Sequence, residues 1–330
     1  MRKRIFKILI IVGLPAAASL FFYRRVAVFI PGDELLHQKM DYLYSPGDKP
    51  DILFLGSSRT LNQIDPRVID SVCGTHSYNL GLNAFNIAEM RMQLRVCLEM
   101  GKIPRVLVIN LDPSSFNTKE PVYSFPEILG YALRDTAVRN SMAEVQDVYA
   151  WKWRYPFYRL QAYTALDDGF KVDAILGDRL YRSAKNRVNG EGAGKAGGDW
   201  RQRRGFEPIY DPYKETYVTP FNITFDDGGF ALLRDIVHLC RRNAIEPVFV
   251  SAPMYRDYRR FFLNAGQVMS RAGRVLNEEG APYFNLIDDS LAYREGDFFN
   301  FVHLNGWAAE RYSRTLAVLL RDSVTGSPFK

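Results

Sequence analysis

The stretch "DILFLGSSRT" (residues 51–60) decides the fold class. Four consecutive apolar residues, Ile52 to Leu55, are followed at once by Gly56, Ser57 and Ser58. A short apolar run without alternation is typical of a strand that is covered on both faces. The glycine and the serines that end it fit either a structural turn with a hydroxyl cap or a nucleophile at the carboxyl end of a sheet. The stretch alone leaves both interpretations open.

Three later segments repeat this pattern of a buried strand, and segments with helical spacing separate them. The predicted strands cover residues 51–56, 105–111, 247–252 and 282–287. The predicted helices cover residues 84–100, 226–243, 261–279 and 307–321. Strands that alternate with helices indicate the α/β class, with a mostly parallel sheet and helices on both of its faces.

The N-terminus carries a basic head and then an uncharged apolar run over residues 8–23. The run is close to the lower length limit for crossing a bilayer. Four Lys or Arg residues precede it and only Arg24 and Arg25 follow it directly, which predicts a cytoplasmic N-terminus. We therefore expect a signal anchor over residues 1–30 in a bacterial inner membrane, with residues 31–330 facing the periplasm or the cell exterior. A cleaved signal peptide and a buried helix are the alternatives.

Residues 117–220 break the alternation of strands and helices, and we interpret them as a long insertion in the α/β domain. Residues 149–163 are dense in aromatic and cationic side chains, which suits a helix packed over the core or a wall facing sugar rings or lipid headgroups. Residues 182–205 are rich in Gly, Lys and Arg, which predicts a mobile loop.

Composition excludes several classes of function. The formal net charge of +6 is mild for 330 residues, and no Lys/Arg tract interleaves with aromatic residues, so nucleic acid is not an expected partner. The three cysteines are odd in number, far apart and without a CxxC pair. This pattern predicts neither a disulfide framework nor a zinc site, and we expect no metal and no cofactor.

A serine nucleophile needs a base, and histidine is the usual one. The chain has four histidines, and His303 is the best placed because it stands just ahead of a predicted helix that Asn305 and Gly306 start. His238 lies within a predicted helix, His37 is close to the expected anchor, and His76 is in a loop. Since ligands of open α/β sheets bind beyond the carboxyl ends of the strands, Ser58 and His303 are the candidates for chemistry.

Three motifs together resemble the SGNH/GDSL hydrolase superfamily. "FLGSSRT" resembles its first block, in which a strand ends in Gly-Asp-Ser and the serine is the nucleophile. "NLGLN" (79–83) resembles the second block, and "HLNGWAAERYS" (303–313) resembles the last. The pattern is most similar to membrane-anchored members in cell-envelope acylation, of the teichoic-acid D-alanylation and alginate-type O-acetylation kinds. The resemblance covers residues 51–116 and about 245–320, and it implies a flavodoxin-like sheet.

The resemblance also implies roles for single residues. Ser58 takes the position of the nucleophile and Ser57 that of the aspartate in Gly-Asp-Ser. Gly81 takes the position of the glycine whose N–H contributes to the oxyanion hole. His303 takes the position of the base.

Two departures from the family pattern affect this site. The residue three positions before His303 is Asn300 rather than an acid, and an amide can hold a histidine tautomer but cannot stabilise the imidazolium by charge. Asp297 and Asp289 are nearby acids that could substitute. The third block is absent, so an oxyanion donor is missing unless Asn83 or Asn110 supplies one.

Two further residues at strand ends are candidates for substrate binding. Arg59 is interpreted either as an anion clamp or as a surface cation. Asp112, after the second predicted strand, is interpreted either as part of the site or as a turn-former ahead of Pro113.

The expected function is that of a membrane-tethered, extracytoplasmic SGNH-like serine esterase or O-acyltransferase. Its expected partners are an acylated cell-envelope or exported polysaccharide, an acyl donor and a membrane-bound O-acyltransferase. The alternative is a non-catalytic scaffold of the same fold that binds glycan or such an acyltransferase, and Asn300 together with the missing third block favours it.

Overall fold

The computed structural model describes residues 34–117, 131, 135–145, 202–214 and 219–323. The chain divides into two units, residues 1–37 with 123–196 and residues 38–122 with 197–330. In the first unit, the described helix α7 (Thr136–Val145) begins after Asp135, whose Oδ1 accepts hydrogen bonds from the N–H groups of Ala137 and Val138. The second unit contains the sheet and the candidate site.

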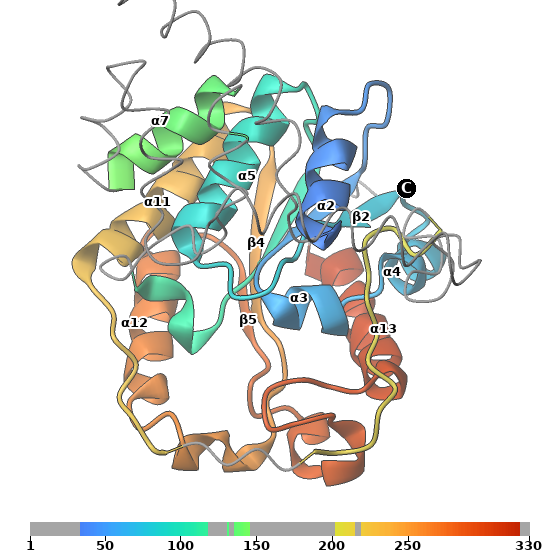
Figure 1. The fold of residues 1–330 in the computed structure, drawn as a ribbon, viewed down its shortest axis with the longest axis vertical. Helices are drawn as coiled ribbons and strands as arrows, with labels where there is room; N and C mark the ends of the chain where they lie inside the picture. The colour runs from blue at the N-terminus through green and yellow to red at the C-terminus, as the bar shows by residue number, and fades with distance from the viewer. Residues whose placement is uncertain (1–33, 118–130, 132–134, 146–201, 215–218, 324–330) are drawn as a thin grey trace, which may run out of the picture. The chain divides into compact units, whose positions relative to one another are not determined.

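A five-stranded sheet forms the centre of the second unit (Figure 1). Its strands are β1 (Ile52–Leu55), β2 (Ser77–Asn79), β3 (Val106–Asn110), β4 (Glu246–Ser251) and β5 (Tyr283–Asn285). The order is β2-β1-β3-β4-β5, and every neighbouring pair is parallel. All residues of β1 and β3 are buried, as their unbroken apolar runs predict. The prediction of an α/β protein with a mostly parallel sheet is therefore confirmed for the described residues.

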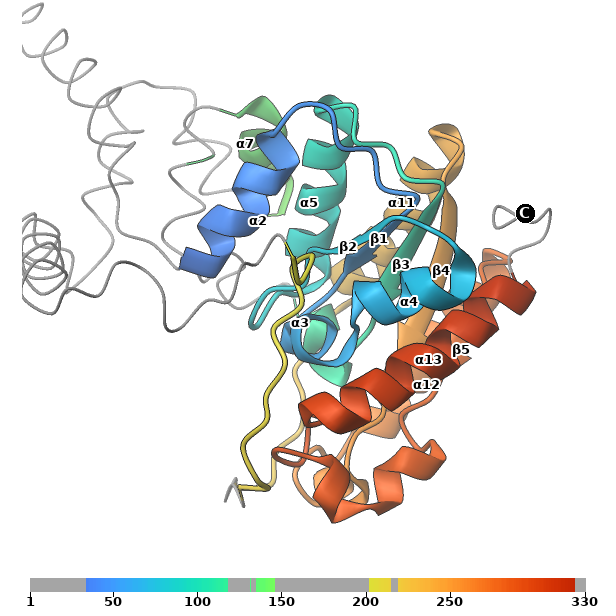
Figure 2. The ribbon, with the colours of Figure 1, turned by 90° about the vertical axis from the view of Figure 1, so that its right-hand side faces the viewer.

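Helices cover both faces of this sheet (Figures 1 and 2). One face packs against α5 (Ile87–Glu99), α11 (Asp227–Arg242) and α12 (Ala265–Glu278). The other carries α4 (Pro66–Cys73) and α13 (Gly306–Ser323), and α13 also contacts the short α3 (Ser58–Gln63). The three cysteines are free and buried, and each lies on one of these helices. The remaining elements are α2 (Glu34–Tyr44), η2 (Pro113–Phe116), η3 (Arg256–Arg260), η4 (Ser290–Tyr293) and η5 (Glu295–Asp297).

The strand order creates a switch point between β1 and β3. From β1 the chain moves outward to β2, and it then returns across β1 to build β3, β4 and β5 on the other side. The connections on the two sides of this point lie on opposite faces of the sheet, which opens a crevice at the carboxyl ends of β1 and β3. Ser57 and Ser58 follow β1 directly, and Asp112 follows β3. The fold therefore brings these residues to the place where open α/β sheets bind their ligands.

Several predictions concern residues that the structure does not describe. The expected anchor over residues 1–30 and the aromatic stretch 149–163 lie wholly outside the described residues, and most of the loop 182–205 does too. Among the described helices, none is both long and apolar enough to cross a bilayer.

The end of the predicted insertion is described, and we call residues 202–214 the return segment. It begins beside the edge strand β2, where the N–H of Asn79 donates to the carbonyl of Arg204 over 3.0 Å. The buried Lys39 Nζ donates to the carbonyls of Asn79 and Gly205 and so fixes the segment to this edge. The N–H of Glu207 then donates to the carbonyl of Leu61 in α3 over 3.0 Å. The return segment therefore covers the otherwise open edge of the sheet.

Candidate active site

The nucleophile turn, Gly56-Ser57-Ser58, connects β1 to α3. Ser57 is the N-cap of α3: its Oγ accepts from the N–H of Arg59 over 3.2 Å, and its carbonyl accepts from the N–H of Thr60 over 3.0 Å. This cap fixes the first turn of the helix and leaves Ser58 as its first residue. Ser57 is buried, whereas Ser58 is half-buried. Of the two serines, Ser58 is therefore the one that a substrate can reach.

Ser58 and His303 lie within hydrogen-bond distance, although 245 residues separate them in the sequence. The Oγ of Ser58 is 2.8 Å from Nε2 of His303. The loop that carries His303 is held against α3, because Nε2 of Gln63 donates to the carbonyl of Val302 over 2.8 Å. Helix α13 follows this loop, and its buried Ser313 Oγ accepts from the N–H of Asp65 over 2.8 Å. The packing of α13 therefore sets the position of the base relative to the nucleophile.

Asn300 orients the imidazole of His303. Its Oδ1 accepts from the N–H groups of Val302 and His303, over 3.0 and 2.9 Å. An amide nitrogen cannot accept these bonds, so they identify the atom that faces the ring as the carbonyl oxygen. That oxygen is also 3.0 Å from Nδ1 of His303, which must then carry its proton. Nε2 is left unprotonated and can accept a proton from Ser58, as a general base requires.

Asp297 does not take the place of Asn300. Its carboxylate pairs with Arg311 on α13, and its carbonyl accepts from the N–H of Asn305 over 2.9 Å. Asp289 instead caps η4, where its Oδ1 accepts from the N–H of Leu291 over 3.1 Å. The structure thus brings Asn300 to His303 and directs both nearby acids to other partners.

The electrostatic surroundings keep His303 neutral. Burial is the largest cause, and together with the positive charge of Arg59 it lowers the pKa of His303 to about 4, while Asp112 acts in the opposite direction. A histidine is a base only in its neutral form, so this shift leaves His303 able to accept a proton at every pH well above 4. A low pKa also makes it a weaker base, and no carboxylate of the described residues contacts its ring to offset that.

As the pH is lowered, we expect the Asn300→Asp variant to lose activity at a higher pH than the natural chain does. A carboxylate beside Nδ1 favours the protonated ring, so it raises the pKa of His303 by about 1–2 units. The acid limb of kcat/KM for 4-nitrophenyl acetate should lie near pH 4 in the natural chain and move upward in the variant, because protonation of His303 removes the base. Asp297→Asn is the matched control and should leave the limb in place. An unmoved limb in Asn300→Asp would contradict the contact.

Arg59 and Asp112 are not available to a substrate, which corrects their assignment to substrate binding and the interpretation of Arg59 as a surface cation. Both are buried, and Nη1 of Arg59 pairs with Oδ1 of Asp112. Oδ2 of Asp112 accepts from the hydroxyl of Ser57, and Nη2 of Arg59 donates to the carbonyl of Ala252 after β4. Ser57 is likewise part of this buried network. Asp112 also lies directly before η2, and its N–H donates to Oγ of Ser115 in η2 over 3.0 Å.

Gly81 does not supply an oxyanion donor, which corrects its assigned role. Its N–H donates to Oδ1 of Asn79 over 2.8 Å and is buried. Asn110 is also excluded, because its side chain is fully buried and out of reach of a substrate. Asn83 is exposed on a turn next to Leu82, whose N–H donates to the carbonyl of Gly56 over 3.1 Å. Asn83 therefore lies close to the nucleophile turn.

The backbone N–H of Ser58 is a candidate donor for the oxyanion. The N–H groups of Arg59, Thr60 and Leu61 bond to Ser57, whereas that of Ser58 has no acceptor among the described residues. In the described part of the chain, the N–H of Ser58 is thus available to an oxyanion, and Asn83 lies on the exposed turn next to Leu82.

Gly81 has a structural requirement instead. A Cβ at this position would lie 2.5 Å from the backbone nitrogen of Leu61 and 2.8 Å from Cβ of Thr60. We expect Gly81→Ala to lower the free energy of unfolding by about 1–3 kcal/mol, because rigid backbone must move to make room. Urea unfolding measures this. Gly266→Ala in α12 is the control, since a Cβ there meets nothing within 4 Å, and it should not destabilise. Equal stability of the two variants would contradict the close packing at Gly81.

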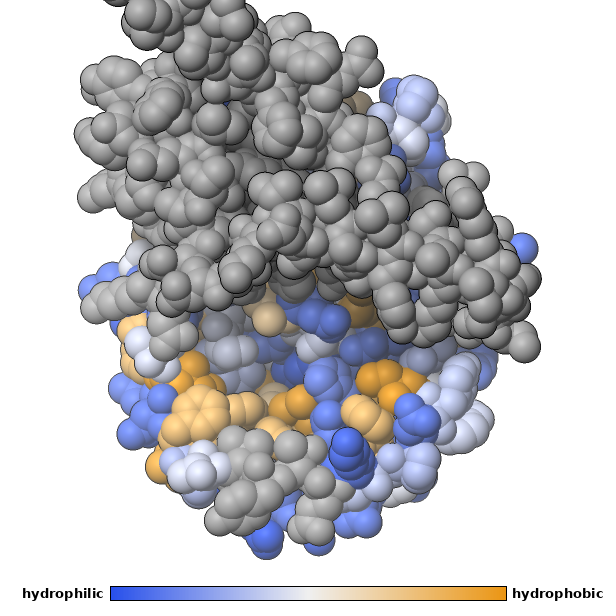
Figure 3. All heavy atoms as spheres, viewed as in Figure 1, coloured by the Kyte–Doolittle hydropathy of each residue, from blue (hydrophilic) through white to orange (hydrophobic). Residues whose placement is uncertain are grey.

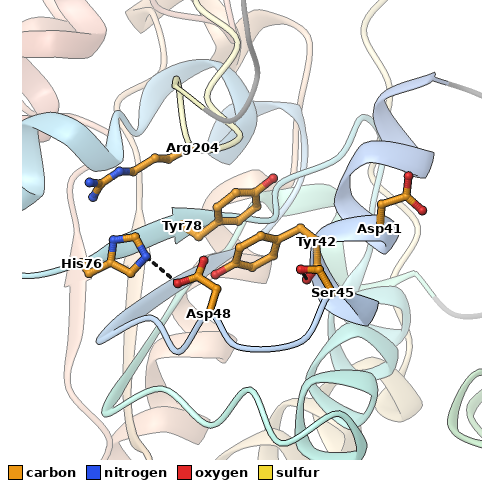
Figure 4. A pocket seen from close by; sticks show the side chains of 7 residues that line it. All are labelled: Asp41, Tyr42, Ser45, Asp48, His76, Tyr78 and Arg204. Atoms are coloured by element: carbon orange, nitrogen blue, oxygen red, sulfur yellow. Dashed lines mark hydrogen bonds and ion pairs between the residues drawn. The ribbon is translucent and has the colours of Figure 1, made fainter.

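A cavity of about 320 Å³ lies at the other end of the sheet (Figure 4). His76 and Asp48 precede β2 and β1, so they lie at the amino ends of parallel strands whose carboxyl ends carry the nucleophile turn. Nε2 of His76 is 2.8 Å from Oδ1 of Asp48, and the rings of Tyr42 and Tyr78 stack with centroids 3.4 Å apart. The lining residues are Asp41, Tyr42, Ser45, Asp48, His76, Tyr78 and Arg204. His76 is thus removed from the candidate bases for Ser58.

His238 is also removed from the candidate bases. It lies on the exposed side of α11, where its Nε2 is 2.9 Å from Oε2 of Glu279. Across the described ranges, no group of three or more His, Cys, Asp or Glu side chains is arranged to hold a metal ion.

Comparisons with known proteins give only low structural similarity. No protein-family model and no curated protein sequence matches the chain. Among solved structures, a protein assigned as an acylhydrolase from Bacteroides fragilis NCTC 9343 is 11% identical with a TM-score of 0.41, over 87% of this chain and 98% of its own. A GDSL-like lipase from Bacteroides thetaiotaomicron VPI-5482 is 10% identical with a TM-score of 0.40, over 86% and 98%.

Proposed function

We propose that this protein is a serine esterase or O-acyltransferase in which Ser58 is the nucleophile and His303 the base. One observation carries the proposal: Oγ of Ser58 is 2.8 Å from Nε2 of His303, while Nδ1 of the same ring faces the carbonyl oxygen of Asn300. A nucleophile, a base and a group that fixes the tautomer of the base are the parts that acyl transfer by serine requires.

The reaction follows from these positions. Oγ of Ser58 attacks the carbonyl carbon of an acyl ester while Nε2 of His303 takes its proton, and the N–H of Ser58 with the amide of Asn83 holds the oxyanion. When the intermediate collapses, His303 protonates the departing alcohol and the acyl group stays on Ser58. Water or a sugar hydroxyl then attacks the acyl-serine, His303 takes the proton of the attacking group, and it returns that proton to Oγ of Ser58.

Exposed aromatic side chains support an acylated polysaccharide as the substrate. The exposed aromatic residues of the described chain are Tyr210, Phe221, Tyr293 and Trp307. Trp307 lies four positions after His303, and its ring packs against that of Tyr210 with centroids 5.2 Å apart. In Figure 3, apolar side chains (orange) gather with polar ones around the loops below the sheet. Rings with one apolar face and one polar edge suit half-wet surfaces such as those that bind sugars.

The sequence of the N-terminus supports the proposed location. A basic head followed by an apolar run over residues 8–23 fits a signal anchor that keeps the domain at the outer side of the inner membrane. At that place the enzyme would meet an acyl donor delivered across the membrane by a membrane-bound acyltransferase. The acceptor would be a cell-envelope or exported polysaccharide, and the chemistry needs no cofactor.

Labelling with a fluorophosphonate tests the proposal, because this probe reacts with a serine only when a base activates it. The domain from residue 31 onward is treated with the probe, and the labelled peptide is identified by mass spectrometry. We expect the label on Ser58. A label on Ser57 or on a serine outside the site, or no label on folded protein, would contradict the proposal.

A non-catalytic scaffold is the second candidate function, and the hydrogen bond from the N–H of Gly81 to Asn79 favours it. Because its N–H donates to Asn79, the site lacks the backbone donor that the superfamily pattern implies, and loss of one oxyanion donor costs about 10²–10³-fold in rate. Such a scaffold would bind glycan or a membrane acyltransferase without turnover. Folded protein that binds acetylated oligosaccharide but never reacts with the fluorophosphonate would favour this function over the enzyme.

A further inference from the structure

A buried ion pair lies directly behind the nucleophile turn. Arg59 and Asp112 are 3% and 5% exposed, so their charges face each other rather than water. Asp112 follows β3 and accepts a hydrogen bond from Ser57, which follows β1. Arg59 donates to the carbonyl of Ala252, which follows β4. The pair therefore joins three strand ends at the crevice that contains Ser58.

The two charges also act on the base, and they act in opposite directions. The ring of His303 is 2.8 Å from Oγ of Ser58, and Arg59 is the residue that follows Ser58, so the pair lies close to the base. At this position the positive charge of Arg59 disfavours the protonated form of His303 and the negative charge of Asp112 favours it. The carboxylates nearest along the chain have other partners, since Asp297 pairs with Arg311 and Asp289 caps η4. Arg59 and Asp112 carry opposite charges, so each opposes the effect of the other on His303.

We propose, on the basis of the proposed function, that Arg59 and Asp112 are positioning residues for acyl transfer. The pair fixes the turn that presents Ser58, and its charge balance sets how readily His303 takes and returns a proton. A buried charge that loses its partner has a strong, poorly screened field. Removing one member therefore exposes His303 to the whole field of the other.

The sign of the effect depends on which member is removed. Arg59→Gln leaves the negative charge of Asp112, so protonated His303 becomes more favourable and its titration moves to higher pH. Asp112→Asn leaves the positive charge of Arg59, so the titration moves to lower pH. One unbalanced charge in this environment corresponds to about one pH unit. The double variant loses both charges and should titrate near the natural chain.

The experiment follows the ring of His303 by NMR in protein labelled with ¹³C-histidine. The chain has four histidines, and His303→Gln identifies the signal of His303 by its loss. Circular dichroism at each pH shows where the variants are folded. Arg67→Gln is the matched control, because Arg67 pairs with Asp65 next to α3 but has a half-exposed side chain, and it should not move the titration.

Opposite shifts in the two single variants, with the double variant between them, support the proposal. For Asp112→Asn, a ring that stays neutral down to the lowest pH at which the chain is folded also counts as the expected downward shift. Shifts in the same direction, or none in folded protein, overturn it, since loss of a structural contact alone predicts no opposition of sign. If Arg59→Gln does not fold, Arg59→Lys decides. It keeps the charge and should titrate like the natural chain while kcat falls, and a titration displaced upward would overturn the proposal.

The titration needs no turnover, so it separates this inference from the proposed function. A natural chain that neither reacts with fluorophosphonate nor hydrolyses esters, but whose His303 shifts as described, contradicts only the proposed function. An active enzyme whose His303 does not respond to either charge contradicts only the role of the pair.

Discussion

Ser58→Ala should lower kcat/KM for 4-nitrophenyl acetate by about 10⁴-fold or more, because it removes the atom that forms the acyl-enzyme. The loss should appear in kcat rather than in KM, since the small hydroxyl contributes little to binding of the ester. The residual rate of the variant should approach the rate that the oxyanion donors alone support without an acyl-enzyme. Steady-state kinetics on variants purified in parallel measure the effect.

Ser57→Ala is the matched control for this substitution. Ser57 caps α3 and bonds to Asp112, so its loss should cost about 1 kcal/mol of stability and change turnover by no more than about tenfold. If Ser58→Ala kept activity within tenfold of the natural chain, Ser58 would not be the nucleophile. If Ser57→Ala lost as much activity as Ser58→Ala, the distinction between the two serines would be wrong.

His303→Gln should have an effect of similar size, about 10⁴-fold in kcat. In serine enzymes, loss of the base alone costs nearly as much as loss of the nucleophile, because the two act as one unit. Glutamine fills a similar volume and keeps a polar end near Ser58, but it takes no proton from a hydroxyl. Combining it with Ser58→Ala should therefore add little further loss, and the double variant measures this directly.

Two other histidines provide the controls for that experiment. His238 pairs with Glu279 on the surface of α11, and His76 contacts Asp48 at the amino end of the sheet. Their glutamine variants should retain full activity. A large loss in either would show that the base had been assigned to the wrong histidine. A small loss in His303→Gln would show that the 2.8 Å contact has no role in turnover.

Much of the fold was predictable, because buried parallel strands leave a simple pattern in a sequence. The apolar runs at residues 51–56 and 105–111 correspond to β1 and β3, and the helical spacing of residues 84–100 and 226–243 corresponds to α5 and α11. These elements are set mainly by local hydrophobicity. The alternation of the two patterns then leaves few topologies other than a parallel sheet with helices on both faces.

The edge strand β2 was not predicted, because two of its three residues are polar and yet buried. Nδ2 of Asn79 donates to the carbonyls of Thr60 and Ile64 over 2.7 and 2.8 Å, and Oγ of Ser77 donates to Oδ1 of Asp70 over 2.6 Å. These hydrogen bonds offset the cost of burying the polar groups. The partners lie 7 to 19 residues away, so the local sequence around β2 does not show that its buried polar groups are hydrogen-bonded.

The candidate site was predictable in its members that end strands or start helices, but not in its electrostatics. From the sequence, Arg59 was interpreted as an anion clamp for a substrate or as a surface cation, because nothing in the residues around it indicates that an arginine there is buried. Its partner Asp112 is 53 residues further along and comes beside it only when β3 pairs with β1. Gly81 was assigned from a short motif, whereas the direction of its N–H is set by the side chain of Asn79.

The position of His303 just ahead of α13 has a consequence during protein synthesis. The base reaches Ser58 only when α13 packs against α3 and α4, and α13 (Gly306–Ser323) follows all five strands in the sequence. A growing chain folds from its N-terminus while its most recent residues are still inside the ribosome. The sheet can therefore form on the ribosome while the nucleophile is still without its base. We expect such a nascent chain to be folded in large part yet unreactive, and to become active only once α13 has left the ribosome and packed against α3 and α4.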